Sequence, residues 1–355
     1  MAHALALAAR GLGRTWPNPA VGCVIIRQGR ILGRGWTQPG GRPHAERRAL
    51  DQAGDAKGAT AYVTLEPCAH HGHTPPCAEA LIAAGVTRVV TALTDPDPRV
   101  SGKGHAMLRA AGIEVREDVL AQEARRLNAG FLKRVTIGLP FVTLKLATTL
   151  DGRIATASGE SRWITGPQAR RYVHALRLTH DAVMVGSGTA RADDPDLTAR
   201  DIGATHQPLR ILLDRTLSHR PDSRLGATAR QNPVWILHAP DAAAAAQQAW
   251  AATGARLLPC PTSNGHLDLT AALRLLAAEG VTRILSEGGG TLAAALTAAG
   301  LVDDLIHMTA GKLIGADGTA ALGPLALPAL TNAPTFRLIG HETLGPDTLS
   351  HWTRP

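Results

Sequence analysis

Three residues in the first quarter of the chain could together hold a metal ion. His44 begins a predicted helix, Cys68 follows a predicted strand, and Cys77 begins the next predicted helix. One imidazole and two thiolates supply three of the four ligands of a tetrahedral zinc ion, and an open fourth position distinguishes a catalytic site from a structural one. The spacing therefore predicts one catalytic zinc ion.

Glu46 stands two residues after the expected ligand His44, so it can lie beside the metal without binding it. Zinc lowers the pKa of a bound water molecule toward neutrality and so makes a hydroxide nucleophile. A neighbouring carboxylate can then carry the proton to a leaving amine. His-x-Glu followed by Pro-Cys and a second Cys is typical of zinc deaminases acting on nucleobases, which have two residues between the cysteines. Here eight residues separate Cys68 from Cys77.

Each of these residues also has an ordinary interpretation, as a loop histidine or a buried thiol. Their order, and their places at the ends of strands and helices, favour the metal. Cys23 lies inside an apolar strand and is expected in the core, whereas Cys260, between two prolines, is expected to be a thiol without a role. Four cysteines at such uneven spacing are too few for a disulfide framework.

Short strands and helices alternate through both halves of the chain, which is typical of layered α/β domains. In the first half, strands are expected at residues 21–26, 30–35, 61–65, 86–93 and 113–117, and helices at 45–53, 78–84 and 105–111. One charged helical segment is expected over residues 120–134. The break at Gly138-Leu139-Pro140 then predicts two domains, residues 1–140 and 141–355.

Three features of the second half could bind phosphate or act in catalysis. Glycines 288–290 lie between a predicted strand and a predicted helix, where bare backbone N–H groups can meet a phosphate. The spacing is not G-x-G-x-x-G, and a tight turn needs the same residues. Lys145 lies inside an apolar strand, where an unpaired lysine is costly, so it is either paired or functional, and we favour a function. Arg177 and Arg200 could bind phosphate by their guanidinium forks, although Arg177 fits a solvated helix face equally well.

Composition limits the possible partners. A length of 355 residues fits two domains, and no apolar run approaches the roughly 18 residues of a membrane span. The net charge is +8, but the arginines are scattered and aromatic residues make up only 3%, which favours a phosphorylated small molecule over a nucleic acid. The apolar residues 2–9 lack the preceding basic residues of a secretory signal. A cytoplasmic homo-oligomer is therefore expected.

The segment Thr64 to Cys77, with Pro17-Asn18-Pro19 before it and Asp95-Pro96-Asp97-Pro98 after it, resembles the deaminase domain of the bifunctional riboflavin-biosynthesis deaminase/reductase family. The resemblance covers residues 4 to about 118 and implies a cytidine-deaminase-like α/β/α domain. It also implies that Asn18 holds the pyrimidine and that His70 faces the substrate. Three residues differ from those usual in the family at expected phosphate or ring contacts, which puts substrate affinity in doubt: Thr37, His73 and Asp97.

Residues 142–153, 158–165, 188–200 and 287–290 resemble the reductase domain of the same family, which is dihydrofolate-reductase-like α/β. The resemblance implies a second cofactor, NADPH, at Ala147, Trp163, Thr189, Asp193, Gly289, Gly290, Thr291, Leu292, Ala293, Ala294 and Ala295. It implies a sugar phosphate at Ser161, Arg177, Leu197, Arg200 and Glu287. Lys145 would be catalytic by polarising the ribose carbonyl or imine, and Arg215 would contact the 2′-phosphate of NADPH.

The expected function is therefore bifunctional. Zinc hydroxide would deaminate 2,5-diamino-6-(5-phosphoribosylamino)pyrimidin-4-one, and NADPH would then reduce its ribosyl group to ribityl, giving 5-amino-6-(5-phosphoribitylamino)uracil. One alternative is an RNA-editing deaminase, which would need clustered basic residues and exposed aromatic residues for base stacking. Another is a reductase whose deaminase domain is weakened, differently specific or purely structural, against which the intact His44, Glu46, Cys68 and Cys77 argue.

Overall fold

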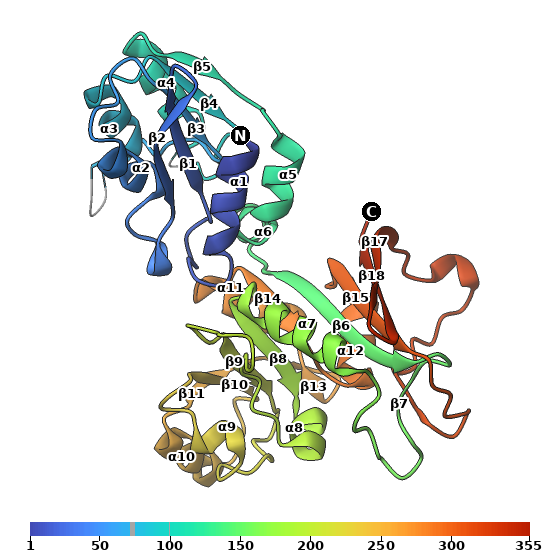
Figure 1. Cartoon of the computed structure of the whole chain (residues 1–355). Coiled ribbons are helices and arrows are strands. Elements are labelled where there is room, and N and C mark those ends of the chain that lie inside the picture. The colour runs from blue at the N-terminus through green and yellow to red at the C-terminus, as the bar shows by residue number, and fades with distance from the viewer. Residues whose placement is uncertain (72–74, 99) are drawn as a thin grey trace. The chain divides into compact units, whose positions relative to one another are not determined.

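The computed structural model describes residues 1–71, 75–98 and 100–355, so His73 lies outside the described residues. The chain folds into two compact units, Met1–Leu139 and Pro140–Pro355 (Figure 1). The first unit ends inside the Gly138-Leu139-Pro140 sequence. Each unit is described by itself below.

A five-stranded sheet with the order β2-β1-β3-β4-β5 forms the middle layer of the first unit. β1 is antiparallel to β2 and β3, whereas β3, β4 and β5 are parallel. The strands are β1 (Gly22–Arg27), β2 (Arg30–Trp36), β3 (Thr60–Val63), β4 (Arg88–Thr91) and β5 (Glu114–Arg116). The helices are α1 (Ala2–Ala8), α2 (Ala45–Ala53), α3 (Cys77–Ala83), α4 (Lys103–Ala110), α5 (Ala121–Leu127) and α6 (Ala129–Ile137). Short 3-10 turns lie at Ala9–Gly11 and Pro39–Gly41.

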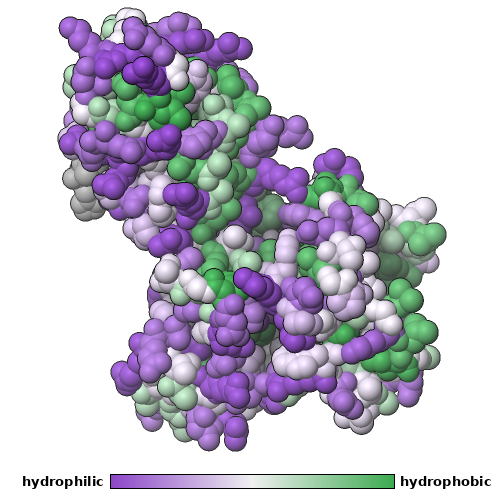
Figure 2. Space-filling model, viewed as in Figure 1, coloured by the Kyte–Doolittle hydropathy of each residue, from purple (hydrophilic) through white to green (hydrophobic). Residues whose placement is uncertain are grey.

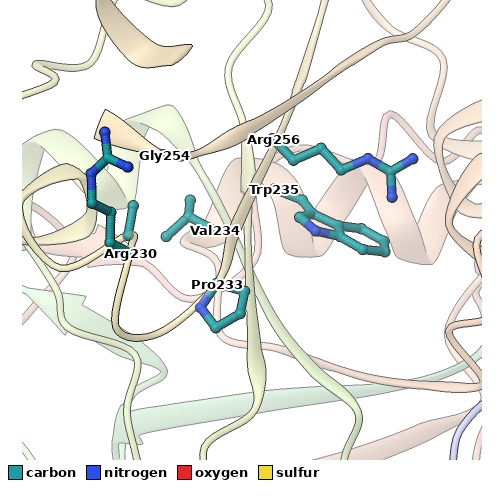
Figure 3. Close-up of a pocket in the computed structure, with 7 residues that line it drawn as sticks. Arg230, Pro233, Val234, Trp235, Gly254 and Arg256 are labelled. Carbon is teal, nitrogen blue, oxygen red and sulfur yellow. The ribbon is translucent and has the colours of Figure 1, made fainter. Parts of the chain in front are cut away.

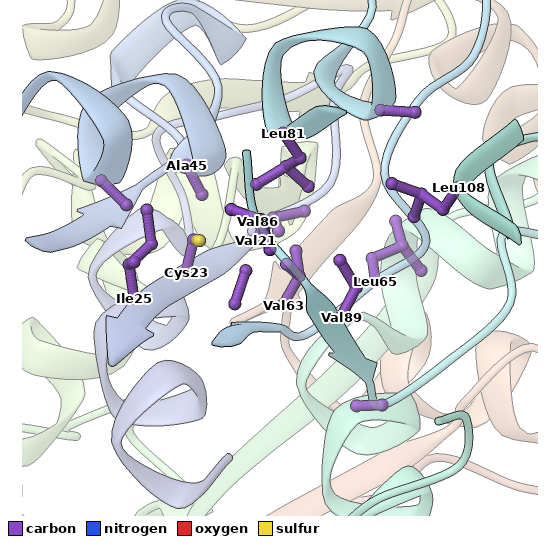
Figure 4. Close-up of a cluster of buried hydrophobic side chains, with 14 of the residues drawn as sticks. Val21, Cys23, Ile25, Ala45, Val63, Leu65, Leu81, Val86, Val89 and Leu108 are labelled. Atoms are coloured by element: carbon purple, nitrogen blue, oxygen red, sulfur yellow. The ribbon is translucent and has the colours of Figure 1, made fainter. Parts of the chain in front are cut away.

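The two faces of this sheet bury different helices because successive side chains of a strand point to opposite faces. On one face, Cys23 and Ile25 of β1 pack in a cluster with Ala45 of α2 and Leu81 of α3 (Figure 4). On the other face, Val24 packs against α1. This is the expected α/β/α layering, and Cys23 is a core residue as predicted.

The helix expected over residues 120–134 is instead two helices, α5 and α6, which meet at Asn128. The side-chain amide of Asn128 accepts a hydrogen bond from the N–H of Ala20 at 3.0 Å and donates one to its carbonyl oxygen at 3.0 Å. Because Ala20 lies 108 residues away, local sequence patterns could not have shown this break.

The second unit contains a nine-stranded sheet with the order β11-β10-β9-β8-β14-β6-β15-β18-β17. Strands from β11 to β15 in that order are parallel, and β18 and β17 continue the sheet antiparallel. They are β6 (Phe141–Thr149), β8 (Ala182–Gly186), β9 (Leu209–Leu213), β10 (Val234–His238), β11 (Arg256–Pro259), β14 (Arg283–Ser286), β15 (Asp304–Ala310), β17 (Arg337–Leu344) and β18 (Asp347–Thr353).

Helices and two small ribbons complete the second unit. The helices are α7 (Pro167–Leu178), α8 (Ser187–Asp193), α9 (Arg224–Ala227), α10 (Ala244–Thr253), α11 (Leu269–Ala278) and α12 (Gly290–Ala298), with a 3-10 turn at Leu330–Asn332. The ribbons pair β7 (Arg153–Ala155) with β16 (Thr319–Ala320), and β12 (Thr262–Ser263) with β13 (His266–Leu267). Among the described helices, none combines the length and apolar composition that crossing a membrane requires.

Two glycines of β2 let helix α2 lie directly on the sheet. A Cβ atom at Gly35 would lie 2.0 Å from the carbonyl oxygen of Ala45, and one at Gly33 would lie 2.0 Å from that of Ala49. No side chain larger than hydrogen fits there without moving the helix backbone. The contact therefore fixes the first turn of α2, which follows His44 and carries Glu46.

We predict that Gly35→Ala destabilises the first unit by about 1 to 3 kcal/mol, as overpacking of a core does, because α2 must move away from β2. Urea unfolding and amide hydrogen exchange in α2 measure the effect. Arg30→Ala, an exposed position of the same strand, is the matched control. Unchanged exchange in α2 of the Gly35 variant would show that the helix does not depend on this contact.

Candidate active sites

His44, Cys68 and Cys77 come together in the first unit as the sequence predicted. Nδ1 of His44 lies 3.3 Å from Sγ of Cys77 and 3.7 Å from Sγ of Cys68, and the three ligand atoms all lie within 4.8 Å of one another. Zinc bonds of about 2.0 Å to nitrogen and about 2.3 Å to sulfur place tetrahedral ligand atoms roughly 3.6 Å apart. The donor set and the spacing both fit zinc.

Three different elements position these ligands. His44 is the N-cap residue of α2, Cys68 follows the carboxyl end of β3, and Cys77 is the first residue of α3. The N–H of Cys77 donates to Sγ of Cys68 at 3.3 Å, and the N–H of Ala78 donates to the carbonyl oxygen of Cys68 at 3.2 Å. These bonds close the base of the long loop, so the eight residues between the two cysteines do not separate the ligands.

The electrostatics of the first site suit proton transfer. Glu46 is only 4% exposed, and this burial raises the pKa of its carboxyl group to about 7. A general acid or base works best when its pKa lies near the operating pH. Hydrogen bonding with Cys77, and then with His44, lowers the pKa of the Cys68 thiol to about 4, so Cys68 is a thiolate, the form that binds metals.

The expected substrate contacts of the first unit differ in how they are held. Asn18 lies against the turn Pro39–Gly41, where a Cβ at Gly41 would meet its Nδ2 at 1.9 Å. His70 is exposed in the loop between the cysteines. Thr37 is buried, and its Oγ1 accepts a hydrogen bond from the N–H of Val21 at 3.0 Å, which makes it part of the fold. Asp97 is also buried.

In the second unit, Arg177 and Glu287 form a buried ion pair. Nε and Nη2 of Arg177 lie 2.6 and 2.9 Å from the two carboxylate oxygens of Glu287, and Nη1 donates to the carbonyl oxygen of Thr198 at 2.7 Å. Their side chains are 11% and 9% exposed. Three of the five guanidinium N–H groups are thus used within the protein, so only the remainder could reach a phosphate.

Lys145 of β6 belongs to the same charged group. Strand β6 pairs with β14, and Glu287 is the residue that directly follows β14. Burial lowers the pKa of Lys145, while the charge of Glu287 opposes that change and the charge of Arg177 adds to it. The structure therefore brings Lys145, Arg177 and Glu287 together at the carboxyl end of β14.

Two of the other expected sugar-phosphate contacts, Leu197 and Arg200, lie in the segment after α8. Arg200 is exposed, with Nη1 3.3 Å from Oδ2 of Asp196 and 3.0 Å from Oγ1 of Thr198. Leu197 is buried in the core beside β8, so only its backbone could contact a ligand. Ser161 is half-buried in the loop before α7.

The expected cofactor contacts gather around the start of α12. The N–H of its N-cap residue Gly289 donates to Oγ1 of Thr189 in α8 at 2.8 Å. A Cβ at Gly290 would lie 2.7 Å from the carbonyl oxygen of Ala320, so glycine is needed there. The N–H of Ala293 donates to the carbonyl oxygen of Gly289. The N–H groups before it in the helix, at Gly290, Thr291 and Leu292, have no partner among the residues that the structure describes. Ala294 is buried, and Ala295 lies further inside the helix.

Trp163 is exposed, and three basic side chains contact it. Its ring lies 4.6 Å from the guanidinium carbon of Arg170 and 5.9 Å from that of Arg162, and its carbonyl oxygen accepts a bond from Lys312 at 2.5 Å. Arg162 also donates to the carbonyl oxygen of Asp193 at 2.8 Å, which links Trp163 to the end of α8. Ala147 lies in β6, opposite Met308 of β15. These residues and the free N–H groups of α12 fit a dinucleotide.

Sequence reasoning missed Arg210, a fully buried arginine in β9. Its guanidinium donates to the carbonyl oxygens of Asp196, Thr228 and Asn232 and to Oγ1 of Thr228, so it holds the segment before Leu197. A charged residue inside an apolar strand was the signal that singled out Lys145, and the same signal could have found Arg210.

A small hollow elsewhere in the second unit lies at the amino-terminal ends of β10 and β11 (Figure 3). Arg256 at its rim stacks on Trp235 at 4.8 Å and pairs with Glu279 at 2.6 Å, and Arg230 donates to the carbonyl oxygen of Ala252. Both arginines are therefore engaged, and no expected site residue lines this hollow.

Comparisons with known families divide the chain in the same way. Residues 1–93 match the family described as the cytidine and deoxycytidylate deaminase zinc-binding region, and residues 140–350 match the RibD C-terminal domain. The fold class expected from the sequence, a cytidine-deaminase-like domain followed by a dihydrofolate-reductase-like domain, is confirmed.

Similar proteins cover nearly the whole chain. The riboflavin biosynthesis protein RibD of Escherichia coli (strain K12) is 46% identical, over 99% of this chain and 97% of that protein. Form 1 of Acinetobacter baumannii RibD superposes with a TM-score of 0.89 and 39% identity, over 99% of this chain and 97% of that chain. A diaminohydroxyphosphoribosylaminopyrimidine deaminase/5-amino-6-(5-phosphoribosylamino)uracil reductase from Thermotoga maritima superposes with a TM-score of 0.88 and 34% identity, over 100% and 97%.

We predict that purified protein carries about one zinc ion per chain and that Cys77→Ala removes it, because two remaining ligands bind zinc weakly. Elemental analysis after gel filtration measures the metal. Cys260→Ser is the matched control, since Cys260 lies in the other unit and its thiol donates only to backbone carbonyl oxygens. Full zinc content in the Cys77 variant would contradict the assignment.

Proposed function

Because the chain belongs to the RibD family, we propose that it catalyses two consecutive steps of riboflavin biosynthesis. Residues 1–140 remove the 2-amino group of 2,5-diamino-6-(5-phosphoribosylamino)pyrimidin-4-one by hydrolysis. Residues 141–355 then reduce the ribosyl group with NADPH, which gives 5-amino-6-(5-phosphoribitylamino)uracil. The observation that carries the proposal is the convergence of His44, Cys68 and Cys77 beside the buried Glu46.

In the deamination step, His44, Cys68 and Cys77 would hold zinc, which would supply a Lewis acid that lowers the pKa of a water molecule and makes it a nucleophile. Glu46 accepts one proton from that water and passes it to the ring nitrogen. It then carries a second proton, from the new hydroxyl group on C2, to the amine that leaves as ammonia. Its pKa of about 7 supports both roles, because the carboxyl group gains and loses a proton near neutral pH. Asn18 and His70 orient the pyrimidine.

In the reduction step, NADPH supplies the hydride, and the protein contributes positioning and electrostatics. The cofactor contacts are Ala147, Trp163, Thr189, Asp193 and Gly289 to Ala295, of which the helix N–H groups before Ala293 suit its pyrophosphate. Arg215, exposed two residues after the end of β9, contacts the 2′-phosphate. Ser161, Leu197 and Arg200 bind the sugar phosphate.

Lys145 is the proposed catalytic group of the second site. Opening of the ribose ring leaves an imine at C1′ and needs a proton on the ring oxygen, and an ammonium group can donate that proton. Because burial lowers its pKa, Lys145 gives up a proton more readily than an exposed lysine does. Glu287, held by Arg177, keeps the ammonium group oriented toward the sugar.

We also propose that the enzyme is a cytoplasmic homo-oligomer that acts on small molecules and not on nucleic acid. All four cysteines are free, and both substrates carry phosphate, which supports the cytoplasm. Hydrophobic surface of the second unit around β7 supports self-association (Figure 2). Exposed apolar side chains of the second unit include Leu150, Leu313, Leu327 and Leu330, which are 67%, 72%, 43% and 90% exposed.

Mass spectrometry of the products, with and without NADPH, tests the proposed function. Incubation of zinc-loaded protein with the diaminopyrimidinone phosphate should exchange an amino group for oxygen without NADPH, and should add two hydrogens only when NADPH is present. Absence of the first mass change, with reduction of the pre-deaminated compound intact, would support a weakened or differently specific deaminase domain.

Substitutions at the two sites should separate the two activities. Glu46→Gln should lower deamination by roughly 10²–10⁴-fold, the usual loss when a general acid or base is removed, and leave reduction of the pre-deaminated compound unchanged. Lys145→Met should lower reduction by on the order of 10²-fold or more and leave deamination unchanged. Each variant is thus the other's control, and loss of both activities in either variant would argue against independent sites.

A further inference from the structure

Glu66, two residues before the zinc ligand Cys68, is bonded to the backbone of a distant segment. Its Oε2 accepts hydrogen bonds from the N–H groups of Asp95 and Gly102 at 3.1 and 2.9 Å. Its Oε1 accepts them from the N–H groups of Gly104 and His105 at 2.8 and 3.2 Å. The side chain is 3% exposed, so these four amides take the place of water.

This carboxylate serves as the N-terminal cap of helix α4. Gly102 is the N-cap residue of α4, and Gly104 and His105 are its second and third residues. The first N–H groups of a helix have no partner within the helix, and the positive end of its dipole favours a negative charge. The side chain of the N-cap residue usually satisfies them, but glycine has none, so Glu66 supplies the acceptor from another element.

A second contact holds α4 against the same segment. A Cβ atom at Gly104 would lie 2.0 Å from the carbonyl oxygen of Pro67, so the helix backbone rests directly on the residue between Glu66 and Cys68. Proline also restricts the backbone there, because its ring fixes φ. The segment Glu66 to Cys68 therefore contacts α4 in two ways, through the side chain of Glu66 and through the backbone of Pro67.

We propose that Glu66 is a positioning residue of the deaminase, which sets the place of the Cys68 thiolate by anchoring the Glu66–Cys68 segment to the N-terminus of α4. Cys68 has to lie near both His44 and Cys77, and its segment approaches them from the end of β3. The inference rests on the proposed function, since it assigns Cys68 as a ligand. A purely structural role would stabilise α4 without affecting the metal.

The test uses full-length protein in which Co²⁺ replaces zinc, because the absorption of Co²⁺ reports the geometry of its thiolate ligands. Glu66→Gln keeps the size of the side chain, but its amide nitrogen faces two backbone N–H donors and leaves them without an acceptor. Glu66→Asp keeps the charge but is too short to reach all four N–H groups.

Glu117→Gln is the matched control. Glu117 also holds α4, since its Oε2 lies 3.0 Å from Nδ1 of His105 and its Oε1 pairs with Arg109, but neither contact involves the Glu66–Cys68 segment. Reductase activity of the second unit checks that each preparation is intact.

We expect both Glu66 variants to shift the cobalt–thiolate absorption, to bind zinc roughly 10- to 100-fold more weakly and to deaminate more slowly, as loss of outer-shell support of a metal does. Glu117→Gln should keep the wild-type spectrum. Wild-type spectra and zinc affinity in the Glu66 variants, or the same shift in Glu117→Gln, would overturn the proposal.

Two other outcomes are also decisive. Loss of hydrogen-exchange protection throughout the first unit in both Glu66 variants would overturn the proposal, because Glu66 would then determine folding rather than ligand position. A wild-type protein that binds Co²⁺ through thiolates but does not deaminate would contradict the proposed function, while the spectra would still test Glu66.

Discussion

Direct contact of helix α2 with strand β2 is the constraint on which the first site depends. Hydrogen is the only side chain that fits at Gly33 and Gly35, so the helix lies on the sheet at backbone distance. That contact fixes where α2 begins, and with it the places of His44 and Glu46. Cys68 and Cys77 reach the same point from β3 and α3, and hydrogen bonds between their segments hold them there before any metal binds.

Buried charge organises the second site in a different way. Lys145, Arg177 and Glu287 lie in a part of the protein where an isolated charge would be strongly disfavoured, and they meet because β6 and β14 are neighbours in the sheet. Arg177 and Glu287 pair in a bidentate manner, so the carboxylate whose charge acts on Lys145 is already fixed in position. One site thus depends on close backbone packing, and the other on compensation of charge.

Several residues near the expected ligands and contacts also support the fold. Thr37 accepts a hydrogen bond from the backbone of Val21, and Leu197 packs in the core. Arg177 uses three of its five N–H groups in hydrogen bonds within the protein. A sequence pattern places a residue near a site but does not say which of its atoms remain available. Only the count of hydrogen bonds already made within the protein decides that.

The sequence by itself predicted the three metal ligands, the acidic residue beside them and the two-part α/β fold, because His-x-Glu, the paired cysteines and the alternation of strands and helices are local patterns. Tertiary structure alone decided what depends on distant backbone: the break at Asn128, the order of strands that joins Lys145 to Glu287, and the anchoring of Glu66 by amides about 30 to 40 positions away. The groups that form these bonds lie far apart along the chain at separations that follow no repeat or motif. No local sequence pattern can therefore predict them.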